Sequence, residues 1–142
     1  MKNILRLRDK KLWLCVAPFT SCLLDKLMTL LGQPARYWAG DYAKYHEGNP
    51  ITAYFLARNP AAYGAYSLVH FILYGLIIML LPKRLALITA LAITIIHFTG
   101  AANWIWLSWK YEQEIILVLA FLMAGLVVWT WARYTAAVSR RQ

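Results

Sequence analysis

The sequence predicts an all-α integral membrane protein, folded as a four-helix bundle. Hydrophobic residues make up 61% of the 142 residues and charged residues only 15%, whereas soluble domains carry roughly 25% charged residues. The apolar residues also gather in four stretches, each near the length of about 20 residues that a helix needs to cross a bilayer. Because four spans use more than half of the chain, we expect residues 1–142 to form a single transmembrane domain.

The four predicted spans cover about residues 12–31, 61–81, 85–107 and 115–131. Pro82, Lys83 and Arg84 form a tight polar break between the second and third spans. A proline disfavours the helical conformation at the residue before it, and a short connection joins helices that are antiparallel neighbours. We therefore expect spans two and three to lie side by side. Residues 109–114 form a similar break between spans three and four.

The distribution of lysine and arginine predicts the orientation. With four spans, ten basic residues fall on one side of the membrane: Lys2, Arg6, Arg8, Lys10, Lys11, Lys83, Arg84, Arg133, Arg140 and Arg141. Four fall on the opposite side: Arg36, Lys44, Arg58 and Lys110. Because basic residues concentrate in cytoplasmic segments, we expect a multi-pass protein of the cytoplasmic (inner) membrane whose N-terminus and C-terminus are both cytoplasmic.

The net charge of +9 follows from this topology. Basic residues beside a span attract anionic lipid headgroups, so the lipid bilayer is the expected partner and no nucleic acid is expected. Lys26 lies inside the first span, and its long side chain is expected to extend outward to the interface. Tyrosines and tryptophans crowd the predicted boundaries, as in the aromatic belts of membrane proteins.

The outer connection between the first two spans, residues 33–60, is longer than a passive loop in a compact bundle. Its aromatic residues and alanines predict one or two short helices along the membrane interface. Gly48 breaks the segment in the middle, and Asn49 is a suitable cap for a helix that starts at Pro50 and runs through Phe55. Residues 59–60, Asn-Pro, repeat this signal at the start of the second span.

Three spans each carry one ionisable residue deep in the apolar stretch: Asp25, His70 and His97. A helix rises 1.5 Å per residue, which puts the three residues roughly 9 to 15 Å below the outer ends of their spans. Hydrocarbon penalises such residues unless they have a partner or a function. Helical spacing adds Thr29 and Ser67, and the loop above adds Glu47, which gives a candidate polar cluster of six residues: Asp25, Thr29, Glu47, Ser67, His70 and His97. The outer loop adds three candidates: Asp41, His46 and Asn49.

Three interpretations of this cluster remain open. In the first, Asp25 bonds a histidine or nearby hydroxyls, and the network fixes the helix register. In the second, His70, His97 and Asp25 bind a divalent metal such as zinc or iron, as in a metal-dependent intramembrane enzyme. In the third, the same residues relay protons or bind a cation in an ion- or proton-coupled transporter component.

The enzyme interpretation has little support from short motifs. The sequence contains no His-x3-His, Cys-x2-Cys or Gly-x-Ser-x-Gly pattern and no glycine-rich phosphate loop. We therefore lean against an enzyme and expect a binding or accessory subunit of a membrane complex. Small residues recur every four positions and allow close helix contacts, with packing inside the bundle favoured over a subunit interface. They are Ala53, Ala57, Ala61 and Ala65, followed on the third span by Ala86 and Ala90.

Two short patterns also resemble a known group of proteins. Asp25-x3-Thr29 near the end of the first span, followed by Glu47-x-Asn49-Pro50 before the second, resembles an uncharacterised family of small prokaryotic polytopic membrane proteins. In that family a lysine often stands in the second helix where this chain has His70. The resemblance covers roughly residues 24–81 and implies a compact helical bundle in which the acid of the first helix and the Glu-x-Asn-Pro turn matter. It implies no known activity.

Overall fold

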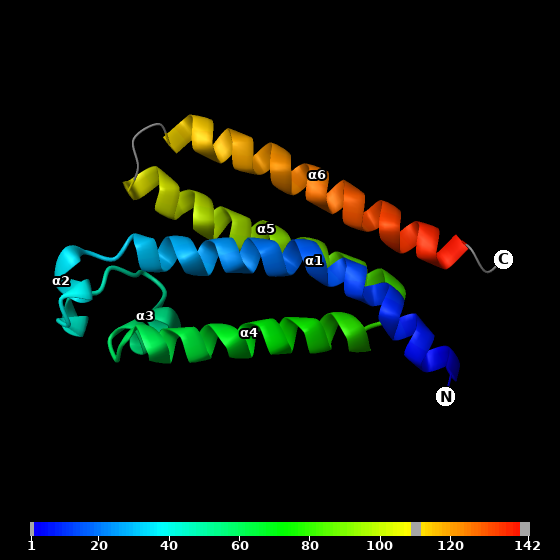
Figure 1. The fold of residues 1–142 in the computed structure, drawn as a ribbon, viewed down its shortest axis with the longest axis horizontal. Helices are drawn as coiled ribbons and strands as arrows, with labels where there is room; N and C mark the ends of the chain where they lie inside the picture. Colours follow the sequence, from blue (N-terminus) through cyan, green and yellow to red (C-terminus); the bar gives the residue numbers. More distant parts are fainter. Residues whose placement is uncertain (1, 109–111, 140–142) are drawn as a thin grey trace.

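The computed structural model describes the backbone of residues 2–108 and 112–139, and every regular element in these ranges is helical (Figure 1). The four long helices are α1 (Lys2–Leu31), α4 (Pro60–Leu80), α5 (Lys83–Ser108) and α6 (Glu112–Ser139). Between α1 and α4 lie α2 (Ala35–Trp38), the 3-10 turn η1 (Tyr42–Lys44) and α3 (Pro50–Leu56). The predicted all-α class is confirmed.

Within the described residues, each of the four long helices contains a segment that is long and apolar enough to cross a membrane. These segments are Lys11–Leu31, Pro60–Leu80, Lys83–Leu107 and Glu112–Ala137. The first three agree closely with the predicted spans. The fourth begins earlier and ends later than predicted. It begins earlier because Glu112 and Glu114 already belong to the first turn of α6, where acidic side chains interact favourably with the helix dipole. Of the predicted break at residues 109–114, residues 109–111 lie outside the described part of the chain.

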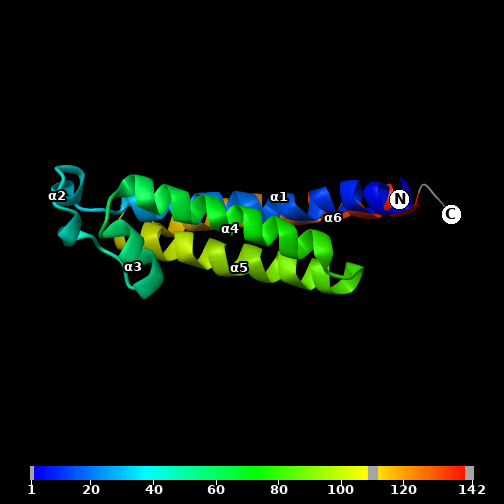
Figure 2. The ribbon, with the colours of Figure 1, turned by 90° about the horizontal axis from the view of Figure 1, so that it is seen from below.

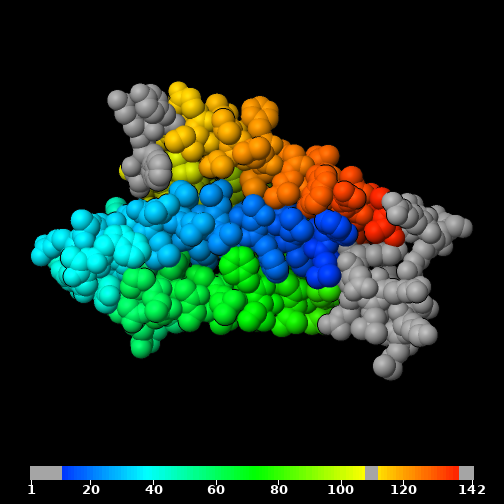
Figure 3. All heavy atoms as spheres, viewed as in Figure 1, coloured from blue at the N-terminus to red at the C-terminus, as the bar shows by residue number. Residues whose placement is uncertain are grey.

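Helix α1 is the centre of the bundle. It packs against α4, α5 and α6, and in Figure 1 it runs between α4 on one side and α6 on the other. In the most apolar 18-residue stretch of each helix, 44% of the residues of α1 are buried but only 11% of those of α6. One face of α1 nevertheless remains uncovered along the gap between α4 and α6 (Figure 3).

The start of α1 and the end of α6 lie at one end of the bundle, and α2, η1 and α3 lie at the other (Figure 1). We call these the terminal end and the loop end. The placement of both termini on the cytoplasmic side of the membrane stays a prediction.

Helices α4 and α5 are antiparallel neighbours, as predicted, and lie side by side in Figure 2. The turn between them is held by Lys11 of α1, whose ammonium donates to the carbonyl oxygens of Met79 and Leu81. These carbonyls lie at the C-terminal end of α4, where a cation is favourable and where no further helical N–H is available.

The caps predicted in the connecting segment are confirmed. The side-chain oxygen of Asn49 accepts hydrogen bonds from the backbone N–H groups of Ile51 and Thr52, at 3.0 and 3.3 Å, and α3 begins at Pro50. The side-chain oxygen of Asn59 accepts from the N–H of Ala62 at 2.7 Å at the start of α4. Each asparagine therefore satisfies N–H groups that a helix start leaves unpaired.

The small residues that recur every four positions lie in two different environments. Ala86 and Ala90 of α5 are buried in the larger core cluster, which also contains Leu14, Ile78 and Tyr134. This part of the predicted internal packing is confirmed.

On the preceding segment only Ala53 is buried, while Ala57, Ala61 and Ala65 are exposed. For these three residues the expectation of packing inside the bundle is wrong. Ala57 is the C-cap of α3. Ala61 and Ala65 face away from the core, because the buried face of α4 is formed by Tyr63, Ser67 and Ile78.

Candidate functional site

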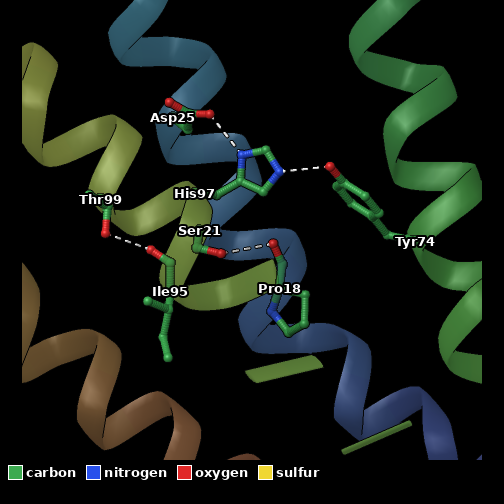
Figure 4. Close-up of polar contacts among 7 residues, drawn as sticks. All are labelled: Pro18, Ser21, Asp25, Tyr74, Ile95, His97 and Thr99. Carbon is green, nitrogen blue, oxygen red and sulfur yellow. Dashed lines mark hydrogen bonds and ion pairs between the residues drawn. The ribbon is translucent and has the colours of Figure 1, made fainter. Parts of the chain in front are cut away.

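The first and third predicted spans meet at a buried hydrogen-bonded pair. Nδ1 of His97 on α5 lies 2.7 Å from Oδ2 of Asp25 on α1, and Nε2 of the same ring lies 3.0 Å from the hydroxyl of Tyr74 on α4 (Figure 4). Three helices are joined through one imidazole. The side chain of His97 is 9% exposed and that of Asp25 is 15% exposed, so the contact is held in a region of low dielectric, where such bonds are strong.

The geometry of this hydrogen-bond chain fits two arrangements of the hydrogen atoms on the ring of His97. Neutral His97 donates from Nδ1 to the Asp25 carboxylate and accepts at Nε2 from the hydroxyl of Tyr74. Protonated His97 donates from both nitrogens, to the carboxylate and to the phenol oxygen. The same geometry therefore accommodates the ring with or without its second proton.

A glycine makes room for the carboxylate. A Cβ atom at Gly100 would lie 2.5 Å from Oδ1 and 3.0 Å from Cγ of Asp25. Gly100 stands one turn after His97 on α5, so the acid lies against the helix backbone beside its partner. Any larger residue at position 100 would move the carboxylate.

The pair forms one wall of a cavity of about 450 Å³, which we call the polar pocket. Helices α1, α3, α4 and α5 and the segment 46–49 line it. The lining residues are Asp25, Lys26, Thr29, His46, Glu47, Gly48, Asn49, Thr52, Tyr66, His70, Tyr74, Ile96, His97, Gly100, Asn103, Trp104 and Leu107. This volume is in the range typical of small-molecule sites.

Lys26 behaves differently from the sequence expectation. Its side chain does not extend out to the interface, because the residue is only 8% exposed and it lines the polar pocket. The ammonium of Lys26 lies 5.6 Å from the ring centre of Tyr63 and 5.2 Å from that of Tyr66, within the range of a cation–π interaction. The ion pairs of the described side chains are Arg36–Asp41 and His97–Asp25, so Lys26 has no carboxylate partner among them.

The loop over the pocket is fixed by Gln33. Its amide nitrogen donates to the carbonyl oxygens of Thr29 and His46, at 2.8 and 2.9 Å, and its amide oxygen accepts from the N–H of His46 at 2.8 Å. Gln33 is 6% exposed. Next along the chain, Oε1 of Glu47 accepts from the N–H of Asn49 at 2.8 Å. The segment 46–49 is therefore held at the loop end of the pocket.

The structure brings most of the predicted site residues together. Seven line the polar pocket: Asp25, Thr29, His46, Glu47, Asn49, His70 and His97. Two lie elsewhere. The hydroxyl of Ser67 donates to the carbonyl oxygen of Tyr63 in its own helix, at 2.8 Å. The carboxylate of Asp41 lies 3.8 Å from the guanidinium of Arg36 in the loop.

His70 lines the pocket between two tyrosines of its own helix. Its ring centre lies 4.3 Å from that of Tyr66, edge to face, and 5.5 Å from that of Tyr74. Nδ1 of His70 is buried and no hydrogen bond from the described residues reaches it. His70 therefore joins the site through ring contacts and not through the Asp25–His97 pair.

The residues predicted to bind a metal do not form a suitable set. Both ring nitrogens of His97 are engaged, one by Asp25 and the other by Tyr74. Within residues 2–108 and 112–139, no three histidine, cysteine, aspartate or glutamate side chains are grouped in a way that could hold a metal ion. A structural or catalytic zinc site needs at least three protein ligands, so this arrangement does not fit one.

Several residues of the site were not predicted to belong to it: Lys26, Gln33, Tyr66, Gly100 and Asn103. One signal was present for Lys26, which directly follows Asp25 in an apolar span and is expensive there unless the protein uses it. Gly100 is the one glycine in the third span, and an isolated glycine in a helix often marks a close approach. The remaining residues carry no distinguishing pattern.

Comparison of the chain with protein-family models, with curated proteins and with solved structures finds no match. The resemblance to a family of small prokaryotic membrane proteins therefore gains no support from a family model, and the site is interpreted from its own geometry.

Proposed function

We propose that this chain is a small binding subunit of the cytoplasmic membrane, which takes up a polar ligand in the pocket between α1, α4 and α5. The observation that carries this proposal is the buried ammonium of Lys26, which lines a cavity of about 450 Å³ without a carboxylate partner among the described side chains. A buried charge is costly unless it is paired, and a bound ligand supplies the missing partner.

The chemistry of the pocket supports binding more than catalysis. Both ring nitrogens of His97 already bond to protein groups, the carboxylate of Asp25 and the hydroxyl of Tyr74, so a ligand would have to displace Tyr74 before it could contact the ring nitrogen directly. Besides the charged side chains of Lys26 and Glu47, the pocket is lined by amides, hydroxyls and rings, among them Thr29, Asn103 and Tyr66. Such groups fix the orientation of a ligand.

Labelling tests whether the pocket opens to the side that the lysine and arginine distribution predicts to be external. Asn103 is exposed and lines the pocket, so an Asn103→Cys variant should react with a membrane-impermeant maleimide added outside intact cells. Ala92 is exposed on the same helix but does not line the pocket. An Ala92→Cys variant is the matched control and should react at least tenfold more slowly, because a thiol in hydrocarbon does not ionise. Equal reactivity of the two variants would contradict the proposal.

The exposed alanine stripe supports a role as a subunit. Ala61 and Ala65 of α4 are spaced four residues apart on the surface, and a Cβ added at Gly64 between them would meet no atom within 4 Å. Small residues at this spacing let a second helix approach closely in a membrane. We propose that this face of α4 contacts another membrane protein.

Co-purification tests the subunit role. Ala61→Leu should remove the partner from complexes extracted in mild detergent, while Ala132→Leu, a change at an exposed alanine of α6, should leave the complex intact. A wild-type protein that purifies alone, or a complex equally sensitive to both changes, would refute it.

A proton-relay role in a transporter component is the second candidate. The continuous chain Asp25–His97–Tyr74 favours it, since its bonds of 2.7 and 3.0 Å cross from α1 to α4 through one ring. In vesicles containing a pH-sensitive dye, Asp25→Asn should abolish any proton flux that the wild type shows. A Thr99→Val variant on the exposed face of α5 is the control. Unchanged flux in Asp25→Asn would exclude this role.

A further inference from the structure

Resting on the proposed binding role, we propose that the polar pocket binds the headgroup of a zwitterionic phospholipid. The phosphate pairs with the ammonium of Lys26, and a primary ammonium on the headgroup pairs with the carboxylate of Glu47. The inference names the ligand class, and it follows from two opposite charges that share one cavity without pairing with each other.

Lys26 supplies the anion-binding corner. The residue is 8% exposed, its ammonium lies near the faces of Tyr63 and Tyr66, and no carboxylate of the described side chains lies within ion-pair distance of it. An ammonium has three N–H donors, and aromatic faces satisfy none of them as an anion does. A phosphate oxygen would form a charge-assisted hydrogen bond there.

Glu47 supplies the opposite charge at the loop end. One of its carboxylate oxygens accepts the N–H of Asn49, and a carboxylate has further acceptor sites on both oxygens. No basic side chain in the described part of the chain lies within ion-pair distance of it. A primary ammonium has donors that match these free sites, whereas an uncharged glycerol headgroup brings no charge.

The order of these groups along the bundle matches the order of groups in a phospholipid. Asp25 contacts His97, so Lys26 lies at the depth of the middle of α5, while Glu47 belongs to the segment over the loop end. In a bilayer the phosphate lies between the acyl chains and the terminal ammonium. A lipid entering from the membrane therefore presents its phosphate to the deeper charge and its ammonium to the outer one.

The pocket also has a rim in the apolar part of the bundle. Ile96 and Leu107 of α5 line it and are 66% and 72% exposed. Both belong to a membrane-spanning segment, so their exposed surfaces face lipid. Ile96 precedes His97 and lies at the depth where acyl chains would leave the pocket. A lipid can thus occupy the cavity with its headgroup while its acyl chains remain in the bilayer. A soluble zwitterion would not need such an apolar rim.

Titration of the full chain in detergent tests the assignment. Short-chain phosphatidylethanolamine, phosphatidylglycerol and free glycerophosphoethanolamine are added separately, and bound molecules are counted by native mass spectrometry. The wild type should bind phosphatidylethanolamine about tenfold more tightly than phosphatidylglycerol, as one additional charge-assisted contact provides. It should bind the free headgroup much more weakly than the lipid.

Two variants separate the two contacts. Lys26→Met keeps an unbranched side chain against the tyrosines and should weaken phosphatidylethanolamine binding at least tenfold, while Lys26→Arg should retain it. Glu47→Gln keeps an acceptor for the N–H of Asn49 and should remove the preference for phosphatidylethanolamine over phosphatidylglycerol while both still bind. The matched controls are Lys44→Gln and Asp41→Asn, which change charges in the loop outside the pocket, and both should behave as the wild type.

The failures are distinguishable. If Lys26→Met binds phosphatidylethanolamine as the wild type does, or if Glu47→Gln keeps the preference, the headgroup assignment is overturned. Equal affinity for free glycerophosphoethanolamine and for the lipid overturns the lipid source. In either case a rapidly labelled Asn103→Cys leaves the proposed binding role in place, whereas an unlabelled one overturns both.

Discussion

The carboxylate of Asp25 lies so close to Gly100 that a single methyl group on the glycine would come within 2.5 Å of its Oδ1 atom. The acid of α1 thus fills the space that a side chain on α5 would take, and it meets His97 from that position. This relationship links the packing of the two helices to the hydrogen bond between them.

Gly100→Ala should therefore destabilise the protein by about 1–3 kcal/mol, since the added methyl displaces the carboxylate from His97. In an Asp25→Ala background the sign should reverse. There the methyl meets no acid, and alanine in a helix is favoured over glycine by roughly 0.5–1 kcal/mol. Thermal unfolding of the four proteins in detergent measures the coupling. Equal effects of Gly100→Ala in both backgrounds would show that the two residues do not interact.

Asp25→Asn should lower the free energy of unfolding by about 1.5–3 kcal/mol, because His97 loses a charge-assisted hydrogen bond. The measurement is the same thermal unfolding. Thr99→Val is the control, since the hydroxyl of Thr99 is exposed and bonds only to the carbonyl oxygen of Ile95 in its own helix. The control should stay within about 0.5 kcal/mol of the wild type. A comparable loss in both variants would point to a general effect of polar changes.

Gln33→Leu should release the segment over the pocket, because three hydrogen bonds of the buried amide disappear. We expect faster hydrogen exchange at the amide of His46, with a global destabilisation of about 1–3 kcal/mol. Gln113→Leu, at an exposed glutamine in the first turn of α6, is the matched control. Unchanged protection of His46 in Gln33→Leu would mean that the segment is held by other contacts.

The loop end should loosen at high pH through Tyr37. This residue is fully buried, outside the spans, and burial raises its pKa above the ordinary value of 10.0. A raised folded-state pKa gives stability that is present below pH 10 and is lost as the pH rises through the folded-state value. Tyr37→Phe should show a smaller loss of stability above about pH 10 than the wild type. The measurement is thermal unfolding of both proteins as a function of pH. Parallel curves of stability against pH for Tyr37→Phe and the wild type would contradict this expectation.

The sequence carried enough information for the elements whose signals are local. The helix beginning at Pro50 could be predicted because its cap, Asn49, directly precedes it in the chain. The depth of Asp25 and His97 in their spans likewise follows from counting residues, and their contact follows once the two spans pack together.

The parts that could not be predicted depend on rotation of one helix against another. Lys26 has a long side chain that could reach the membrane interface. It points into the pocket because Tyr63 and Tyr66 of α4 lie there and contact its ammonium by cation–π interactions. Ala61 and Ala65 of α4 have the spacing that is typical of a helix–helix contact inside a bundle. They lie on the surface because α4 is rotated so that Tyr63 faces the core. No local pattern encodes these rotations.

The central position of α1 has a consequence for biosynthesis. Its acid, Asp25, and the imidazole that pairs with it are separated by 72 positions in the chain, so the first span leaves the ribosome long before its partner exists. During that interval a carboxylate and the neighbouring ammonium of Lys26 have no α5 to pack against. The insertion machinery or the headgroup region must shelter them until the third span arrives, because only then can the hydrogen bond between Asp25 and His97 form.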